Sequence, residues 1–233
     1  MRALLLAAGL GTRLRPLTNT IPKCLVPING KPLLYYWLKL LSDAGVKPIL
    51  VNLHYFGDKV TEYLEVSGFK DIVKTVYEEN LLGTAGTLLK NRDFFQDEAL
   101  ILIHADNLSR FDVSAFIERH KKRPDYCEIT MMTFFTQAPD TCGVVELDEY
   151  GVVKAFHEKI QNPPGNLANG AVYIVEPSVF EFLDSLGKEE IDFSTEVLPN
   201  YLDRICTFHN DIYHRDIGTM ESYEAATREY IVE

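Results

Sequence analysis

In the first half of the chain, apolar residues occur either in short continuous runs or at helical spacing. Residues 2–7 form an apolar run that ends in a glycine-rich stretch, which predicts a buried strand followed by a loop. Residues 33–44 carry apolar side chains at helical spacing and stop at Gly45, as expected for a helix. The same patterns predict strands over residues 48–53, 72–77 and 99–104, and helices over residues 58–66 and 84–90.

The second half carries shorter apolar runs. They predict strands over residues 128–135, 143–147, 152–157, 171–175 and 206–214, and a closing helix over residues 220–230. Strand–helix alternation in the first half indicates right-handed βαβ units. We therefore expect an α/β fold with a mostly parallel, Rossmann-like central sheet flanked by helices. We expect a single domain over residues 1–233, with a parallel half to about residue 110 and a mixed half over 111–233.

Composition narrows the function classes. The net charge of −11 argues against nucleic-acid and anionic-membrane partners, because both are bound by basic surfaces. No run approaches the 18 or more apolar residues of a membrane-spanning helix. The cysteines are far apart and fit neither a zinc site nor a disulfide framework, so we expect buried free thiols and a cytoplasmic protein. The four are Cys24, Cys127, Cys142 and Cys206.

The loop after the first strand is the first candidate for chemistry. Gly9-Leu10-Gly11 would let backbone N–H groups approach phosphate oxygens, and Arg13 and Lys23 would add positive charge. Leu14 stands where the dinucleotide-binding and P-loop patterns require glycine, so both interpretations fail. Asp106 also follows a predicted strand end, where ligands gather in parallel sheets. In isolation, such an aspartate is more often a turn residue or a helix cap.

Read as a whole, this segment is far more specific. It reads L-L-A-A-G-L-G-T-R-L-R-P-L-T over residues 5–18, then I-P-K-C-L over 21–25 and V-P-I-N-G-K-P-L over 26–33. This closely resembles the signature of the sugar-1-phosphate nucleotidylyltransferases. The resemblance is closest to short, single-domain members that are similar to mannose-1-phosphate guanylyltransferases.

Later segments resemble the family's motifs in the same order. They are E-E-N-L-L-G-T-A-G-T-L at 78–88, I-H-A-D at 103–106, C-G-V-V at 142–145, F-H-E-K at 156–159, N-G-A-V-Y at 169–173 and D-I-G-T at 216–219. Three depart from the usual pattern: Ala105 replaces a glycine, Cys142 replaces an aromatic residue, and the glycine at position 170 falls one place early.

The resemblance implies a fold, an activity and a set of site residues. The fold is that of the nucleotide-diphospho-sugar transferases, with residues 1–110 mainly binding nucleotide and 111–233 mainly binding sugar. The activity is transfer of a nucleoside monophosphate from a nucleoside triphosphate, with GTP favoured, to a sugar 1-phosphate. Lys23 and Arg13 are the implied catalytic residues, and Asp106 and Asp216 the implied Mg²⁺ ligands. The implied nucleotide-binding residues are Leu6, Ala8, Gly9, Gly11, Thr12, Arg13, Lys23, Gly83, Thr84 and Gly86, and the sugar-phosphate-binding residues are Gly143, Glu158, Lys159 and Asn169.

Several alternatives remain open. The enzyme could be a uridylyl- or cytidylyltransferase acting on another small phosphate, or a catalytically inactive nucleotide-sugar sensor. His104 and His214 each stand two residues before an implied metal ligand, and we expect packing or hydrogen bonding from them rather than metal binding. We expect nucleotide and sugar-phosphate substrates, no nucleic-acid or membrane partner, and no β-helical acyltransferase domain in this length; homo-oligomerisation is left open.

Overall fold

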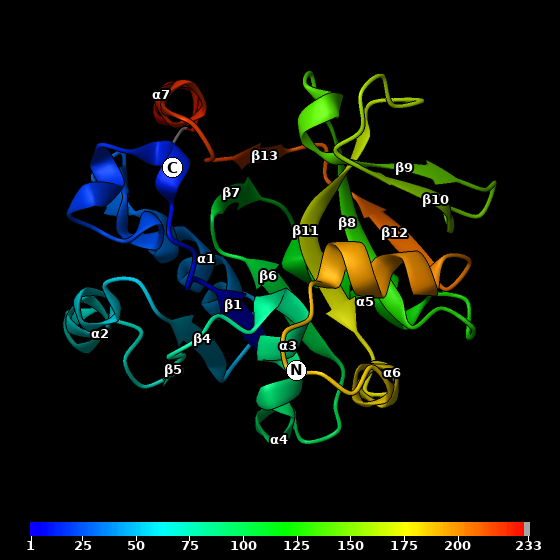
Figure 1. Cartoon of the computed structure of the whole chain (residues 1–233), viewed down its shortest axis with the longest axis horizontal. Helices are drawn as coiled ribbons and strands as arrows, with labels where there is room; N and C mark the ends of the chain where they lie inside the picture. The colour runs from blue at the N-terminus through cyan, green and yellow to red at the C-terminus, as the bar shows by residue number, and fades with distance from the viewer. Residues whose placement is uncertain (231–233) are drawn as a thin grey trace. The chain divides into compact units, whose positions relative to one another are not determined.

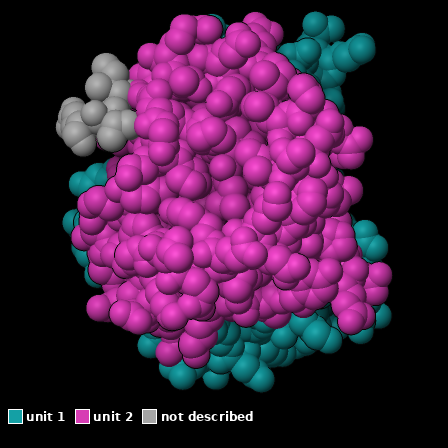
Figure 2. Space-filling view, turned by 90° about the vertical axis from the view of Figure 1, so that its left-hand side faces the viewer, with its two compact units in different colours: residues 1, 82–102, 112–211 teal, residues 2–81, 103–111, 212–233 magenta. Residues whose placement is uncertain are grey.

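The structure of the chain is a computed structural model, and it describes residues 1–230. Its backbone contacts divide it into two compact units, coloured separately in Figure 2. Unit 2 contains residues 2–81, 103–111 and the segment from Ile212 to the C-terminal end. Unit 1 contains Met1, residues 82–102 and residues 112–211. The strand β6 (Leu100–His104) contributes its first three residues to unit 1 and its last two to unit 2.

Unit 2 is built on three parallel strands. The first, β1 (Arg2–Leu6), pairs with β4 (Ile49–Leu53), which pairs with β5 (Val73–Tyr77). Parallel neighbours need a crossover, and here helices supply both (Figure 1). The remaining elements are the 3₁₀ turns η1 (Thr12–Leu14), η2 (Leu17–Asn19) and η3 (Lys23–Leu25), strands β2 (Pro27–Ile28), β3 (Lys31–Pro32), β7 (Asn107–Arg110) and β13 (Tyr213–Asp216), and helices α1 (Leu33–Asp43), α2 (Gly57–Val66) and α7 (Met220–Glu229).

Unit 1 carries a mixed sheet. Strand β8 pairs in parallel with β12 and antiparallel with β11, while β9 pairs antiparallel with both β10 and β11. These strands are β8 (Ile129–Phe135), β9 (Gly143–Leu147), β10 (Val153–Glu158), β11 (Leu167–Val175) and β12 (Ile205–His209). The other elements are helices α3 (Gly83–Lys90), α4 (Arg92–Phe95), α5 (Val113–Lys121) and α6 (Val179–Ser185), the 3₁₀ turns η4 (Pro139–Thr141) and η6 (Leu198–Tyr201), and the π-helical turn η5 (Phe193–Val197).

The α/β fold with a mostly parallel central sheet, flanking helices and a mixed β portion is confirmed. One predicted strand is wrong: residues 206–214 belong to two strands, β12 and β13, which are separated by residues 210–212. The polar pair Asn210-Asp211 lies at this break, but the local sequence does not reveal that the two halves pair with different partners, β8 and β7. The helices α5 and α6 were not predicted.

Burial agrees with the expected core strands. Residues 3–5 of β1 and all of β4 are buried, so the apolar start of the chain is an internal strand. Among the described residues, no helix is long and apolar enough to cross a membrane. Three of the four free cysteines are buried as predicted, whereas Cys142 is partly exposed.

Candidate active site

The loop that leaves β1 is held by a buried polar pair. Asn52, the last residue but one of β4, accepts a hydrogen bond from the Ala7 backbone N–H at 2.7 Å. Its amide donates to the Glu78 carboxylate at 3.1 Å, and both side chains are buried. A buried polar residue without a partner would be costly, so this pairing explains why β4 tolerates an asparagine. The sequence prediction missed Asn52, although it is the single polar residue in the apolar run of residues 49–53.

The two glycines of this loop have different surroundings. Gly11 has a φ of +60°, and an added Cβ would lie 3.0 Å from the Thr18 methyl carbon and 3.1 Å from the Lys23 Cβ. Gly11 is therefore required by the packing of the loop itself. At Gly9 an added Cβ would meet nothing within 4 Å, so protein packing does not account for that glycine.

Lys23 and Arg13 lie on the irregular segment that follows. Prolines keep this segment out of regular helix, and it forms three short 3₁₀ turns as far as Leu25. The Lys23 side chain is only 8% exposed, whereas that of Arg13 is 70% exposed. Lys23 is therefore a positioned ammonium group, and Arg13 is a cation with access to solvent.

Pairing of two short strands brings the two predicted metal ligands together. In the antiparallel pair β7–β13, Asp216 lies opposite Asn107, the residue after Asp106. The Ile217 N–H also donates to the Asp106 carbonyl oxygen at 3.3 Å. Two aspartates that are 110 positions apart in the chain therefore become neighbours in unit 2.

Lys23 contacts both carboxylates. Its Nζ lies 2.9 Å from Asp106 Oδ2 and 3.6 Å from Asp216 Oδ1. Arg13 Nη2 lies 4.0 Å from Asp216 Oδ2. An added Cβ at Gly218 would lie 2.6 Å from Asp216 Oδ2 and 3.2 Å from Arg13 Nη2, so this glycine leaves room for the pair. The structure thus gathers four of the predicted site residues and adds Gly218, which the D-I-G-T motif had already marked.

The charges of this cluster act on one another. Partial burial raises the pKa of the Asp106 carboxyl, but the Lys23 ammonium, together with His104 and hydrogen bonding, lowers it below its ordinary value. Burial lowers the pKa of His214 to about 3, against the opposing effect of Asp106. His214 is therefore a neutral imidazole near neutral pH, and Asp106 a carboxylate.

The donor set at this cluster fits magnesium. Mg²⁺ is commonly held by one or two carboxylates and completes its octahedron with water and substrate phosphate oxygens. Asp106 and Asp216 supply that number of carboxylates, and their side chains are 45% and 49% exposed. The described residues contain no group of three or more His, Cys, Asp and Glu side chains that could hold a metal ion by themselves, so a cation here would also need water and substrate oxygens.

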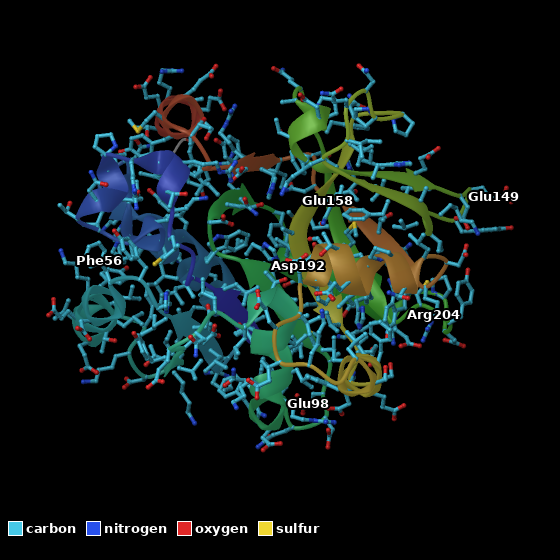
Figure 3. The ribbon with its side chains drawn as sticks, in the orientation of Figure 1. Phe56, Glu98, Glu149, Glu158, Asp192 and Arg204 are labelled. Atoms are coloured by element: carbon cyan, nitrogen blue, oxygen red, sulfur yellow. The ribbon has the colours of Figure 1, made fainter. Side chains whose placement is uncertain are left out.

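Unit 1 gathers a second set of predicted residues. Gly143 and Glu158 are register partners in the β9–β10 pair. An added Cβ at Gly143 would lie 2.7 Å from Glu158 Oε2 and 2.6 Å from the Phe156 ring. Lys159 Nζ contacts Glu158 Oε1 at 3.0 Å and is 64% exposed, while Glu158 is 25% exposed. Figure 3 labels Glu158 at the end of its strand. Gly143 therefore lets the Phe156 ring and the Glu158 carboxylate pack directly against its backbone, next to the accessible Lys159 ammonium group.

Asn169 lies on β11 at an irregularity of the strand. Its amide donates to the Tyr173 hydroxyl at 2.6 Å, and its Oδ1 accepts the Ala171 N–H at 2.9 Å. The pairing of β11 with β8 shifts register between Asn169 and Tyr173, and Ala171 has a φ of +53°. The left-handed position is therefore Ala171, although the glycine of the motif precedes it at position 170.

The predicted nucleobase loop is packed against protein backbone. An added Cβ would lie 2.5 Å from the Ile191 carbonyl oxygen at Gly83, and 2.1 Å from the Glu189 carbonyl oxygen at Gly86. The Thr84 hydroxyl donates to Asp192 Oδ2 at 3.2 Å and accepts the Phe193 N–H at 2.6 Å. Figure 3 labels Asp192 at this packing. These glycines thus have a structural reason that is independent of any ligand.

Comparison with known proteins identifies the family. The family model described as nucleotidyl transferase matches residues 2–233. The chain belongs to this nucleotidyl transferase family.

Relatives in this family act on several substrate pairs. A D-glycero-alpha-D-manno-heptose 1-phosphate guanylyltransferase of Campylobacter jejuni is 32% identical, over 96% of this chain and 97% of the relative. A UTP–glucose-1-phosphate uridylyltransferase of Synechocystis is 30% identical over 98% of this chain. A mannose-1-phosphate guanylyltransferase catalytic subunit beta of Drosophila pseudoobscura is 32% identical over 91%. The chain spans only 63% and 58% of the length of these last two relatives.

Solved structures agree with the fold. HddC from Yersinia pseudotuberculosis is 27% identical, with a TM-score of 0.83 over 98% of each chain. Its complex with GMP-PN gives a TM-score of 0.81 over the same shares. A Bacillus anthracis structure that is 21% identical matches with a TM-score of 0.87.

The predicted residues of this nucleotidyl transferase fall into separate groups. Unit 2 holds Leu6, Ala8, Gly9, Gly11, Thr12, Arg13, Lys23, Asp106 and Asp216, and unit 1 holds Gly83, Thr84, Gly86, Gly143, Glu158, Lys159 and Asn169. Their binding roles stay predictions.

Proposed function

We propose that this chain transfers a guanylyl group from GTP to a manno-configured sugar 1-phosphate, releasing pyrophosphate. The observation that carries the proposal is the nearly buried Lys23 ammonium, which contacts Asp106 and Asp216 beside the loop of Gly9. Such a cluster suits a reaction between two polyanions, where positioning and electrostatic stabilisation supply most of the catalysis.

No general base is needed in this reaction. The nucleophile is an oxygen of the sugar phosphate, which is already anionic. It attacks the α-phosphorus, and the bond from this phosphorus to the bridging oxygen of pyrophosphate breaks. The chain's residues therefore have to hold phosphate charge rather than remove a proton.

Lys23 is the proposed catalytic residue. An ammonium group has three N–H donors, and its contacts with Asp106 and Asp216 use two at most. The remaining donor can stabilise negative charge that develops on the α-phosphate. Arg13 is exposed and planar, which suits the β- and γ-phosphates and the departing pyrophosphate.

Asp106 and Asp216 are the proposed ligands of Mg²⁺. When bound, this ion neutralises phosphate charge at the reacting group. Asp106 is ionised at neutral pH, as this role requires, since its pKa lies below the ordinary aspartate value. In unit 1, Lys159 would bind the phosphate of the sugar, and Glu158 would accept hydrogen bonds from sugar hydroxyls.

The preference for guanine and a manno-configured sugar rests on relatives. The Campylobacter jejuni protein matches nearly all of both chains and is a guanylyltransferase for a manno-heptose phosphate. The Drosophila and Sulfolobus acidocaldarius relatives are named for mannose 1-phosphate and guanylyl transfer. We further propose that the protein acts in the cytoplasm, where both substrates would be available.

The test is a matrix of pyrophosphate release with magnesium chloride. GTP, UTP, CTP, ATP and dTTP are each combined with the 1-phosphates of mannose, glucose, N-acetylglucosamine and manno-heptose. We expect the strongest release with GTP and mannose or manno-heptose 1-phosphate, and its loss with excess EDTA. Highest release with UTP and glucose 1-phosphate would replace the guanylyl assignment, and a blank matrix from folded protein would refute the activity.

A further inference from the structure

The segment that carries Arg13 and Lys23 lacks the support of a helix or a sheet. Its backbone hydrogen bonds join residues three positions apart, such as Leu14 N–H to the Gly11 carbonyl and Asn19 N–H to the Pro16 carbonyl. Such isolated 3₁₀ turns provide little stability by themselves. The conformation of this segment must therefore depend on tertiary contacts.

Thr18 is the centre of these contacts. Its side chain is fully buried, and its hydroxyl donates to the Gly11 carbonyl oxygen at 2.7 Å. Its methyl carbon and the Lys23 Cβ lie on the same side of Gly11, 3.0 and 3.1 Å from the position of an added Cβ. Displacement of Thr18 would therefore disturb both the glycine loop and the stem of Lys23.

Tyr55 holds Thr18 from outside the segment. Its hydroxyl donates to the Thr18 carbonyl oxygen at 3.0 Å, across 37 positions of sequence. The next residue, Phe56, has a φ of +52°, which is unfavourable for a side chain of this size. The Tyr55 and Phe56 rings pack at 4.3 Å between centroids. This strained turn lies at the start of α2, where Figure 3 labels Phe56. It directs Tyr55 toward the segment that carries Arg13 and Lys23.

Lys59, in the first turn of α2, makes a second tie. Its Nζ donates to the Thr20 carbonyl oxygen at 2.6 Å and lies 5.1 Å from the centre of the Phe56 ring. This contact is exposed, so its contribution is smaller than that of the partly buried Tyr55 bond. Two side chains from one helix start thus hold two carbonyl groups of the segment.

We propose that Tyr55, supported by Lys59, is a positioning residue that holds residues 11–23 in the conformation that binds the nucleoside triphosphate. This inference rests on the proposed function. Tyr55 acts through the carbonyl group of Thr18, and Lys59 acts through that of Thr20. A segment that is ordered before binding costs the ligand less free energy to order, so loss of the tie weakens nucleotide binding first.

The first measurement is amide hydrogen exchange of residues 9–25 without any ligand. Tyr55→Phe removes only the hydroxyl, and we expect exchange in this segment to become about 3- to 10-fold faster. Lys59→Met keeps the apolar stem, and we expect a smaller acceleration. The matched control is Tyr63→Phe, because the hydroxyl of this α2 tyrosine has no hydrogen-bond partner among the described residues.

The second measurement separates positioning from general destabilisation. With the best substrate pair of the matrix, Tyr55→Phe should raise KM for the triphosphate about 3- to 10-fold. We expect kcat and KM for the sugar phosphate to stay within about twofold, and Tyr63→Phe to match the wild type. Calorimetric titration with magnesium and GTP should show the same loss as a raised Kd, independently of turnover.

Three results would overturn the proposal. Unchanged exchange together with raised KM would mean that Tyr55 contacts the nucleotide directly. Faster exchange with unchanged KM and Kd would mean that the tie is only structural. A fall in kcat alone would place its role in the chemical step. A wild-type protein that binds GTP but turns over no substrate pair would refute the proposed function, while exchange and Kd still decide the role of Tyr55.

Discussion

Lys23 has surroundings that are unusual for a lysine. A lysine is rarely buried unless it is paired, and this one is 8% exposed between two carboxylates. The identity of the residue and its motif were legible in the sequence. The burial and the two contacts were not, because they depend on Asp106 and Asp216, which lie far along the chain.

Replacement of this lysine tests its catalytic role. Lys23→Ala removes the ammonium group from the α-phosphate, and we expect turnover to fall about 10²- to 10³-fold or more. Lys39→Ala is the matched control, since Lys39 forms an exposed ion pair with Asp43 and should leave turnover unchanged. Steady-state pyrophosphate release measures both. A normally folded Lys23→Ala protein with wild-type turnover would contradict the assignment.

The glycines allow a contrast between ligand and packing roles. Gly9→Ala adds a methyl group in open space at an ordinary φ, so the free energy of unfolding should change by less than about 1 kcal/mol. If phosphate oxygens approach this backbone, KM for the triphosphate should rise about tenfold or more. Gly86→Ala is the counterpart. Its Cβ would meet the Glu189 carbonyl oxygen at 2.1 Å, and it should lower the free energy of unfolding by about 1–3 kcal/mol.

Urea unfolding and nucleotide kinetics on the same two variants decide this contrast. A strongly destabilised Gly9→Ala would show that packing explains that glycine after all. An unaffected Gly86→Ala would show that the backbone of residues 189–191 moves aside readily.

At the scale of elements, one short strand pair and one irregular strand set the geometry of the predicted site residues. The short pair β7–β13 places Asp216 opposite Asn107 and so beside Asp106. The register shift in β11 turns Asn169 toward Tyr173. Bulges and short edge pairs often lie next to functional sites, because they redirect side chains that a regular ladder would leave alternating.

Strain at the β11 irregularity can be measured. Ala171 adopts a φ of +53°, which costs a residue with a Cβ about 1 kcal/mol more than glycine. Ala171→Gly should therefore raise the free energy of unfolding by about 0.5–1 kcal/mol. Ala168→Gly, at a buried position of the same strand, should lower it by a similar amount. If both substitutions destabilised equally in urea, left-handed strain at position 171 would be excluded.

At the scale of the whole molecule, stability should depend on pH through a buried network in unit 1. His120 contacts Thr130 at 2.7 Å and Glu176 at 2.9 Å, and Arg123 pairs with the same carboxylate at 2.5 Å. Burial, and then Arg123, lower the pKa of His120 to about 4, although Glu176 opposes them. The folded protein therefore keeps this imidazole neutral well below the ordinary histidine pKa.

The direction of the pH effect follows from proton binding. Between pH 6.5 and 4 the unfolded chain protonates His120 while the folded chain does not, so stability should fall as pH decreases. The loss from this group is at most about 3 kcal/mol and is complete below pH 4. Chemical unfolding from pH 7 to 4 measures it. His120→Gln should flatten the curve over this window, and parallel curves for the two proteins would contradict the prediction.

The local pattern of apolar residues predicted many of the helices and strands. Arg2–Leu6, Ile49–Leu53 and Gly57–Val66 lie within about two residues of their predicted bounds, because their apolar spacing reports local geometry directly. The break between β12 and β13 was missed, because both sides of it are equally strand-like. Pairing partners are chosen by distant residues, and this information is absent from any short window of sequence.

The same division holds for the site. The sequence alone determined the α/β class, through the order of its apolar runs. It also determined the glycine loop and the residue types at positions 13, 23, 106 and 216, since each belongs to a local motif. Only the tertiary structure decided that Lys23 lies within 2.9 Å of Asp106 and 3.6 Å of Asp216, that Asn52 anchors Ala7, and that Tyr55 holds Thr18. It also decided that Gly83 and Gly86 pack on backbone while Gly9 faces open space. These facts depend on contacts between residues that are distant in sequence, and such contacts exist only once strands have paired and side chains have packed.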